Sequence, residues 1–449
     1  MLRSKIKRAH ALRLTGSFIF LGTFFQTASA QDSSAAIDTG DTAWIIAATA
    51  LVLFMTLPAL ALFYGGLVRT KNVLSVLMQC LIITCVMSLI WVVCGYSLAF
   101  DTTGMVKGEV GLNSFIGGTS KIMLNGITPD TILSGYTIPE ILFVAFQMTF
   151  AAITPALMIG AFCERMKFSA IIVFSALWLL VVYVPICHMT WGGDGGLFWD
   201  WGVIDLAGGI VVHVTAGFAA LVACIMVGKR KGYPKQVLPP HNLTMTVTGT
   251  CMLWVGWFGF NAGSGLAANG SAATTLMVTH LSACTATLVW MLVEWMKSGK
   301  PGVLGAATGA IAGLAAITPA SGSVGPGGAI AIGATSGLVC FIFSTAIKSK
   351  FGYDDSLDVF GVHGIGGFLG TVMVGVFGHK TMGGFADFEN IGSQVVTQLT
   401  AASITAVYAI VVSVVLLLLI KFTIGLRINE AQETEGIDMA EHAERGYNM

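Results

Sequence analysis

The composition of this 449-residue chain excludes a soluble globular protein. Charged residues make up only 10% of it, against roughly 25% in an average soluble protein, whereas hydrophobic residues make up 55%. So few charges cannot cover globular domains of this total length, and long apolar runs without a short period exclude disordered, collagen-like and coiled-coil proteins. The formal net charge is zero, which gives no reason to expect nucleic acid as a partner. The chain is therefore predicted to be an all-α polytopic membrane protein.

Residues 1–30 have the pattern of a secretory signal peptide. Basic residues precede the apolar stretch GSFIFLGTFF, and the small residues Ala28 and Ala30 precede Gln31. An uncleaved anchor is the alternative, but the apolar stretch is shorter than the ~20 residues that a membrane span needs. We expect cleavage after Ala30, which starts the mature chain outside the cytoplasm.

Eleven apolar runs are predicted to cross the membrane within one domain at 31–425. They lie near 43–67, 73–99, 139–162, 168–190, 205–228, 242–262, 272–296, 302–318, 326–347, 358–378 and 394–425. An odd number of spans puts the termini on opposite sides, so an N-terminus outside places the tail at 426–449 in the cytoplasm.

Basic residues test this topology, because short cytoplasmic loops carry an excess of Lys and Arg. Twelve lie in loops assigned to the cytoplasm and three lie in the longer loops assigned to the outside. The first group is Arg69, Lys71, Arg165, Lys167, Lys229, Arg230, Lys231, Lys235, Lys297, Lys300, Lys348 and Lys350; the second is Lys107, Lys121 and Lys380. The bias supports this orientation of a multi-pass protein, and we expect its membrane to be the inner (plasma) membrane of a bacterium.

Two segments 150 residues apart share one motif. His213 begins HVTAGF in the predicted fifth span and His363 begins HGIGGF in the tenth, so both fit H-x-x-x-G-F. Each follows an acid, Asp205 or Asp358. Because five spans separate the segments, they run in opposite directions, as in an inverted-topology repeat. The first five and the next five spans are predicted to be its halves, with the eleventh outside the repeat.

The repeated histidines are candidates for function, because ionisable groups in a span are costly and usually face a cavity or each other. Hydrogen bonds that hold helices together are the alternative. Neutral imidazoles are expected in narrow apolar surroundings, and a pair can offer one donor and one acceptor to a small uncharged molecule.

Asp205 precedes His213 by eight residues, about two helical turns or ~12 Å, which predicts both on one face. His188 and Asp358, nearer span ends, are expected to form structural hydrogen bonds. Neither a metal site nor a cofactor is expected, because no Cys or carboxylate clusters with the histidines.

Aromatic residues stand at the predicted outer ends of several spans. Phe146 and Phe150 are one helical turn apart, and Trp191 follows the fourth span beside glycines. Phe260 and Ser264 close the sixth span. Most such rings form a lipid-facing belt. If Trp191, Phe146 and Ser264 converge, however, they would attract a cation by ~1–2 kcal/mol.

Several long segments, in order, resemble the ammonium transporter family, which includes methylammonium permeases and Rhesus glycoproteins. They are LPALALFYGGLVRTKNVLS, FQMTFAAITPALMIGAFCERMKFSA, HMTWGG, DLAGGIVVHVTAG, HNLTMTVTGTCMLWVGWFGFNAGS and DVFGVHGIGG. Because Rhesus members lack a tryptophan at the position of Trp191, the chain resembles the ammonium transporters of this family more than its Rhesus members. The resemblance covers nearly the whole mature chain and implies a homotrimer of eleven-span protomers, each with its own pore.

The resemblance also implies roles for the outer aromatic residues. Phe146, Trp191 and Ser264 resemble the site that recruits the ammonium ion. Phe150 and Phe260 resemble the stacked pair that blocks the pore below that site.

Further roles are implied deeper in the membrane and in the tail. Asp205 matches the family aspartate expected to act structurally or electrostatically in deprotonation, and His213 and His363 match the twin histidines that line the pore. The tail at 426–449 resembles the segment that coordinates protomers and, in many bacteria, contacts PII-type nitrogen regulators. The role of the loop at 101–138 is open.

The expected mechanism is capture of ammonium or methylammonium, deprotonation near the phenylalanine pair, and passage of ammonia along the histidines. Moving an intact cation into an apolar pore costs many kcal/mol, which aromatic attraction cannot offset. Net charge movement is expected from the resemblance; a passive ammonia channel and a sensor acting through a cytoplasmic partner are alternatives. A water or glycerol channel is disfavoured because the paired Asn-Pro-Ala turns are absent. An enzyme is disfavoured because no nucleophile lies beside an activating base at comparable depth.

Overall fold

Long apolar helices make up the structure, a computed structural model that describes residues 36–236 and 238–447. The predicted signal peptide lies outside these described residues. Ten helical stretches are long and apolar enough to cross a membrane by length and composition. This finding confirms the predicted all-α polytopic class.

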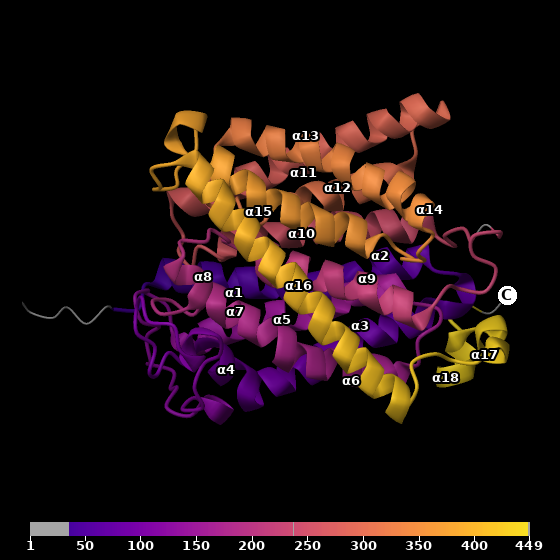
Figure 1. Ribbon diagram of the computed structural model, residues 1–449, viewed down its shortest axis with the longest axis horizontal. Helices are drawn as coiled ribbons and strands as arrows, with labels where there is room; N and C mark the ends of the chain where they lie inside the picture. The colour runs from indigo at the N-terminus through magenta and orange to yellow at the C-terminus, as the bar shows by residue number, and fades with distance from the viewer. Residues whose placement is uncertain (1–35, 237, 448–449) are drawn as a thin grey trace, which may run out of the picture. The chain divides into compact units, whose positions relative to one another are not determined.

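The helices follow one another along the chain, and the longest connection between them is the loop from α4 to α5 (Figure 1). The α-helices are α1 (Thr39–Phe54), α2 (Ala61–Leu67), α3 (Val73–Ile90), α4 (Tyr96–Phe100), α5 (Glu140–Phe162), α6 (Phe168–Trp178), α7 (Val184–Trp191), α8 (Leu197–Asp200), α9 (Thr215–Val227), α10 (Leu243–Gly263), α11 (Gly270–Ser298), α12 (Val303–Ile317), α13 (Pro326–Ile342), α14 (Lys348–Phe351), α15 (Ile365–Phe377), α16 (Ile391–Thr423), α17 (Glu430–Glu435) and α18 (Ile437–His442).

Six spans contain a π-helical segment, in which the backbone makes one wider turn. These segments are η1 (Met55–Leu60), η3 (Trp91–Gly95), η6 (Leu179–Tyr183), η7 (Gly209–Val214), η8 (Phe343–Ile347) and η9 (Phe360–Gly364). In η1 the wider turn contains Pro58, which has no N–H for the regular helical ladder. Both candidate histidines lie in such segments, His213 in η7 and His363 in η9.

The predicted eighth span differs from the others in length. It corresponds to α12, which has 15 residues, or ~22 Å of helix, against ~30 Å of hydrocarbon. Nearly every residue of α12 is buried, because α10, α11, α13 and α15 pack around it. A helix enclosed by protein does not have to match the thickness of the lipid, so an apolar run of this length still belongs in the bundle.

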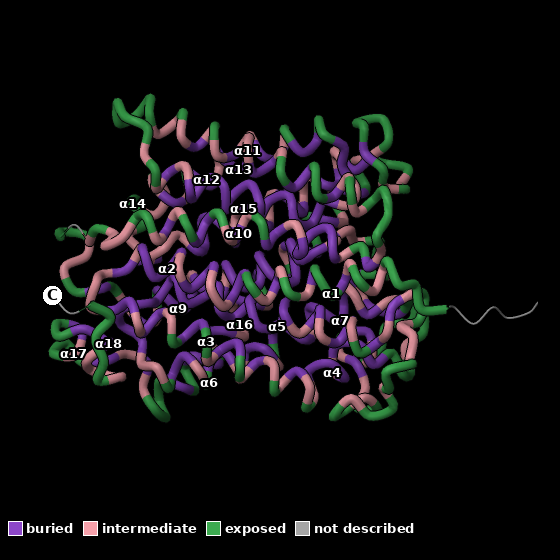
Figure 2. Tube along the Cα trace, turned by 180° about the vertical axis from the view of Figure 1, so that it is seen from behind, coloured by how far each residue is buried: buried purple, intermediate pink, exposed green. Residues whose placement is uncertain are grey.

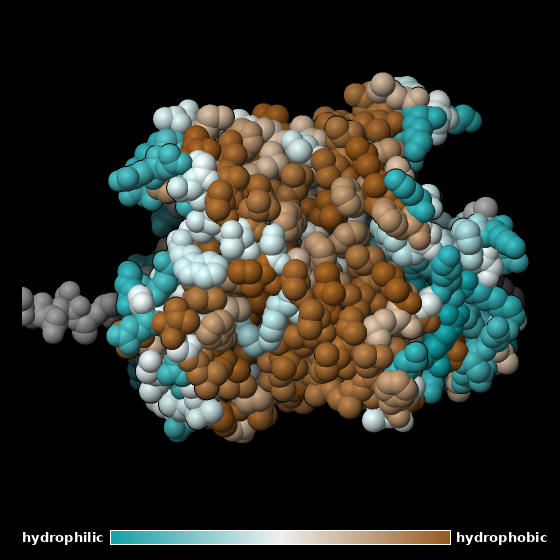
Figure 3. All heavy atoms as spheres, in the orientation of Figure 1, coloured by the Kyte–Doolittle hydropathy of each residue, from teal (hydrophilic) through white to brown (hydrophobic). Residues whose placement is uncertain are grey.

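The surface and the interior are both apolar over the middle of the bundle. Hydrophobic side chains cover the centre of the visible face, and hydrophilic ones gather at its two ends (Figure 3). Buried segments run through the middle, while exposed ones lie on the periphery and at the ends (Figure 2). The long helix α16 crosses this face diagonally (Figure 1). This distribution fits a bundle surrounded by lipid, with water at each end.

One end of the bundle carries buried ion pairs and is called here the tail end. Glu164, just after α5, binds Arg69 at 2.8 Å and Arg230 at 2.9 Å, and Arg230 also binds Asp354 at 2.8 Å. Burial alone would raise the pKa of Glu164, but the positive charges of Arg230 and Arg69 hold it below its usual value. These pairs join loops from both halves of the chain.

The C-terminal helices α17 and α18 lie at this same end (Figure 1). The Asp438 carboxylate accepts hydrogen bonds from the backbone N–H groups of Leu74 and Ser75, at the start of α3. The Glu433 carboxylate accepts the backbone N–H of Lys231, in the loop after α9, at 2.6 Å. The tail is thus fastened by charged groups to the loops beneath it.

Candidate functional site

The repeated motif packs two helices against each other at their closest approach. A Cβ at Gly217 would lie 2.1 Å from the backbone nitrogen of Gly364, and a Cβ at Gly367 would lie 2.5 Å from the Cβ of His213. Each motif therefore supplies the glycine that makes room for the segment carrying the other histidine. This mutual packing explains why histidine and glycine recur at the same spacing.

The two histidine rings meet directly. The Nδ1 atoms of His213 and His363 are 3.2 Å apart, and both residues are buried. A hydrogen bond between two Nδ1 atoms requires one of them to carry a proton and the other to lack it. In neutral rings the two Nε2 atoms are then one acceptor and one donor. Nε2 of His213 is buried without a hydrogen-bond partner among the described residues, so it is free for a small molecule.

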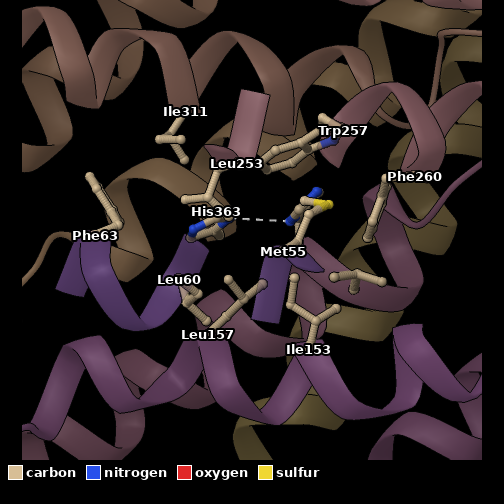
Figure 4. Close-up of a pocket in the computed structure, with 12 residues that line it drawn as sticks. Met55, Leu60, Phe63, Ile153, Leu157, Leu253, Trp257, Phe260, Ile311 and His363 are labelled. Carbon is tan, nitrogen blue, oxygen red and sulfur yellow. Dashed lines mark hydrogen bonds between the residues drawn. The ribbon is translucent and has the colours of Figure 1, made fainter. Parts of the chain in front are cut away.

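A narrow cavity lies beside these rings (Figure 4). Its volume is about 10 Å³, close to the smallest space that holds one water-sized molecule. Apart from the two histidines, its lining is almost wholly apolar: Met55, Leu60, Phe63, Ile153, Leu157, Val212, Leu253, Trp257, Phe260 and Ile311. The cavity therefore suits a small molecule that needs one or two hydrogen bonds and carries no charge.

A chain of aromatic rings leads away from the histidines. The rings of His213 and Phe260 have centroids 6.2 Å apart, and Phe260 lies 4.3 Å from Phe150. Phe150 also contacts Phe146 at 5.0 Å and Trp191 at 6.0 Å. The contact between Phe150 and Phe260 leaves them side by side between Trp191 and the cavity. We call the end of the bundle that holds this group the Trp191 end.

The three residues expected to recruit a cation differ in exposure. Trp191 and Ser264 are half-buried, whereas Phe146 is fully buried behind them. The Ser264 hydroxyl donates to the backbone oxygen of Phe260 at 2.8 Å, so its own oxygen can still accept a hydrogen bond. The indole Nε1 of Trp191 donates to the backbone oxygen of Asp205 at 2.7 Å, which fixes one edge of the ring.

Asp205 does not lie on a helix, and the prediction that it shares a helical face with His213 is wrong. The helical segment begins at Gly209, and Asp205 stands in the irregular chain before it. Its carboxylate folds back to accept four backbone N–H groups, those of Gly208, Gly209, Ile210 and Val211, at 2.6–3.2 Å. Asp205 is therefore a buried anion that caps the helix carrying His213.

The position equivalent to Asp205 in the other repeat is Asp355, which the sequence analysis missed by pairing Asp205 with Asp358. The Asp355 carboxylate accepts the N–H groups of Val359 and Phe360, as Asp205 does in its own half. Asp358 instead forms an ion pair with Lys348 at 2.7 Å. The spacing of 150 residues that relates the two histidines also relates Asp205 to Asp355 and could have identified it.

Two further residues complete this region. His188 contacts the backbone oxygens of Ala99 and Asn113, each at 2.8 Å, which confirms its expected hydrogen-bonding role. Trp257 stacks on His213 with centroids 5.6 Å apart and was not predicted. It stands one helical turn before Phe260, so the aromatic spacing in WVGWFGF was the available signal.

Comparisons with known proteins agree on one family. A model described as the Ammonium Transporter Family matches residues 43–447. An ammonium transporter of Aquifex aeolicus is 43% identical over 93% of this chain and 95% of its own length, and one of Bacillus subtilis is 43% identical over 91% and 98%. Among solved structures, Mep2 of Candida albicans has a TM-score of 0.79 at 35% identity, covering 88% of each chain. A protein described as "Sensor Amt Protein" has a TM-score of 0.82 at 28% identity, covering 90% of this chain and 98% of its own.

Proposed function

We propose a transport mechanism from an established premise: this chain belongs to the ammonium transporter family. It is a multi-pass membrane transporter of ammonium, and its relatives are transporters and not enzymes. The remaining question is how its residues tell ammonium from other small cations of the same charge.

Recruitment occurs at the Trp191 end. The exposed part of the Trp191 ring offers a negative face, and the oxygen of Ser264 offers an acceptor for an N–H group. Phe146 and Phe150 add aromatic surface behind them, with centroids 5.0 Å apart. Attraction of this kind amounts to ~1–2 kcal/mol, which concentrates a cation at the mouth but does not draw it inside.

Between these aromatic residues and the histidines, the path through the protein interior suits a neutral molecule. Phe150 and Phe260 close it with centroids 4.3 Å apart, and the cavity behind them is apolar. Taking a bare cation into such surroundings costs many kcal/mol, whereas ammonia keeps most of its hydrogen bonding if it meets suitable partners. Ammonium therefore gives up a proton near the phenylalanine pair: one N–H bond breaks, the proton passes to solvent at the Trp191 end, and ammonia enters the cavity. The negative charge of the buried Asp205 attracts both the incoming cation and the released proton. Potassium has no proton to lose and is excluded.

The hydrogen bond between His213 and His363 is the observation that carries the proposal. It leaves one donor and one acceptor at Nε2 atoms beside a cavity of about 10 Å³. Ammonia can donate to one and accept from the other. The test is methylammonium uptake in cells without their own transporters, with His213→Ala and His363→Ala beside the wild type. Uptake should fall at least tenfold at equal membrane abundance. Unchanged uptake and selectivity would reduce the pair to helix packing.

The proton is expected to cross as well, which makes transport electrogenic. This expectation comes from the family. Recording on a solid-supported membrane under an ammonium gradient should show a current. Uptake without any current would instead favour a passive ammonia channel.

A sensor is the second candidate, favoured by the likeness to the protein described as "Sensor Amt Protein". Such a sensor would act through a cytoplasmic partner that binds at the tail end. This candidate would be supported if cells without the protein lose their response to ammonium and the purified protein shows no ammonium uptake. Uptake by the purified protein supports transport.

We propose a homotrimer, as the family resemblance implies, and a contact between copies would also cover an exposed polar group. His280 on α11 is exposed, and its Nε2 lies 3.5 Å from the sulfur of Cys284. An imidazole facing lipid is costly, and contact with a second copy removes that cost. Light scattering in detergent should give the mass of three protomers. A monomer would contradict the proposal.

The tail end is assigned to the cytoplasm of a bacterial cell, with the N-terminus outside after removal of residues 1–30. The basic loops beneath the tail follow the positive-inside rule. A PII-type regulator is proposed to bind at this face. Reporter fusions to the two termini test the orientation, and N-terminal sequencing of the membrane protein tests the cleavage.

A further inference from the structure

The stretch at 202–208, between α8 and η7, has no regular helix, and it passes from the exposed Gly202 through the half-buried Ile204 to the buried Asp205, Ala207 and Gly208. Backbone groups at membrane depth must find partners within the protein, because lipid offers none. Leu206 donates to the backbone oxygen of Pro319 at 3.2 Å. Other partners come from α16, the eleventh span, which stands outside the repeat and begins at the same end of the bundle as α8 (Figure 1).

Two glutamines on α16 hold this stretch. Gln398 is fully buried, and its amide binds both backbone groups of Ile204: Oε1 accepts the N–H at 2.8 Å, and Nε2 donates to the oxygen at 2.7 Å. Nε2 also donates to the backbone oxygen of Thr371 on α15 at 3.0 Å. One turn earlier, Gln394 donates to the backbone oxygen of Gly202 at 2.9 Å. Ile204 is thus held on both sides by one side chain.

The residue after Ile204 connects these hydrogen bonds to Trp191. Asp205 follows Ile204, and the oxygen that Asp205 offers to Trp191 belongs to its own backbone. A shift of the Ile204 peptide therefore moves the acceptor that orients the indole. Nothing else among the described hydrogen bonds fastens the indole N–H.

We propose that Gln398 is a positioning residue for the outer ammonium site, acting on Trp191 through the backbone of Ile204 and Asp205. Gln394 supports it from the preceding turn. The eleventh span thereby serves the capture step, although it contributes no side chain to the cavity. The inference rests on the proposed role of Trp191 as a recruitment residue.

The first test compares two buried positions of α16. Gln398→Leu removes both hydrogen bonds to the backbone of Ile204. Ser413→Ala is the matched control, because Ser413 is equally buried and accepts a hydrogen bond from Trp178 at 3.2 Å, away from the site. Methylammonium uptake is measured per membrane-inserted trimer. Gln398→Leu should raise KM about fivefold to tenfold, while its maximal rate stays within about twofold of the wild type. Ser413→Ala should leave KM unchanged. A loss of maximal rate alone in Gln398→Leu would overturn the inference.

The second test is a double-mutant cycle with Trp191→Phe, which keeps an aromatic ring and removes the indole N–H. If Gln398 acts through Trp191, Gln398→Leu should add little to the KM of Trp191→Phe. Independent, multiplicative effects would overturn the inference and leave the recruitment site in place. An unchanged KM in Trp191→Phe would overturn the recruitment site itself, and the inference with it.

A milder variant guards against loss of folding. If Gln398→Leu gives no trimer in the membrane, Gln394→Leu is measured instead, since it removes one contact to Gly202 and leaves Gln398 in place. A rise in KM of about twofold is expected. An unchanged KM in that variant would count against the inference.

Discussion

The two helices that the repeat relates begin with the same backbone arrangement, but the side chains around these two helix starts differ. At the Trp191 end, Asp205 caps η7, and at the tail end, Asp355 caps η9. Aromatic rings stand beside the first cap, whereas the ion pair of Lys348 and Asp358 stands beside the second. The repeat thus brings the two histidines together, and we propose that the unrepeated side chains decide which end captures a cation.

The side chains that bind the non-helical backbone before Asp205 and before Asp355 also differ between the two ends. Gln398 binds the backbone before Asp205, and Arg165 binds the backbone oxygen of Asp354, directly before Asp355, at 2.6 Å. An arginine at the Trp191 end would place a positive charge near the incoming ammonium and repel it. A neutral amide supplies the hydrogen bonds without that cost. We therefore attribute the difference to the charge of the substrate, on the proposal that ammonium enters at the Trp191 end.

The largest effect is expected from removing the charge of the first cap. Asp205→Asn loses an anion that accepts four N–H groups and turns an amide NH₂ towards some of them. Methylammonium uptake should fall at least about a hundredfold, since each charge-assisted bond is worth ~1.5–3 kcal/mol. Asp355→Asn, which affects two N–H groups and lies away from the recruitment site, should cost about tenfold. Equal losses would remove the distinction between the two ends.

A smaller effect is expected at the aromatic group. Trp191→Ala removes the exposed ring face, so KM for methylammonium should rise about tenfold, in line with ~1–2 kcal/mol of cation attraction. The maximal rate should change less, because the histidines and the cavity are untouched. Concentration-dependent uptake measures both values. A loss confined to the maximal rate would place Trp191 outside the capture step.

The tail end should tolerate the loss of its own ion pair. Lys348→Met removes the partner of Asp358, and both side chains are partly exposed, so the pair is worth only ~1 kcal/mol. Uptake at low methylammonium concentration should change by about twofold or less. A change as large as that of Trp191→Ala would mean that both ends bind the substrate cation.

The smallest effect on transport is expected from Glu164→Gln, which acts on stability. Because Arg230 and Arg69 hold the pKa of Glu164 below its usual value of ~4.3, the ionised group stabilises the fold above that pH. This stabilisation is lost as the pH falls through the lowered pKa. Thermal unfolding in detergent from about pH 6 to about pH 3 should therefore show a steeper acid loss for the wild type than for Glu164→Gln, with the difference developing below the usual pKa of ~4.3. Identical slopes would assign the acid sensitivity to other groups.

The sequence predicted the parts of the molecule that depend on composition and spacing. Apolar runs marked the spans, and the H-x-x-x-G-F motif marked the two histidines that the structure brings within 3.2 Å. It did not reveal where the fifth helix begins, because the irregular chain at 205–208 is as apolar as a helix. Nor did it reveal Gln398, whose partner Ile204 is 194 residues away and is joined to it only by folding.

The central claim is that the transporter excludes potassium because potassium cannot give up a proton. The most direct test uses purified protein in liposomes, with equal inward gradients of ammonium and potassium applied in turn. Ammonium should produce uptake and a current, and potassium should produce no more than protein-free liposomes do. Potassium transport at a rate comparable to that of ammonium would contradict the claim.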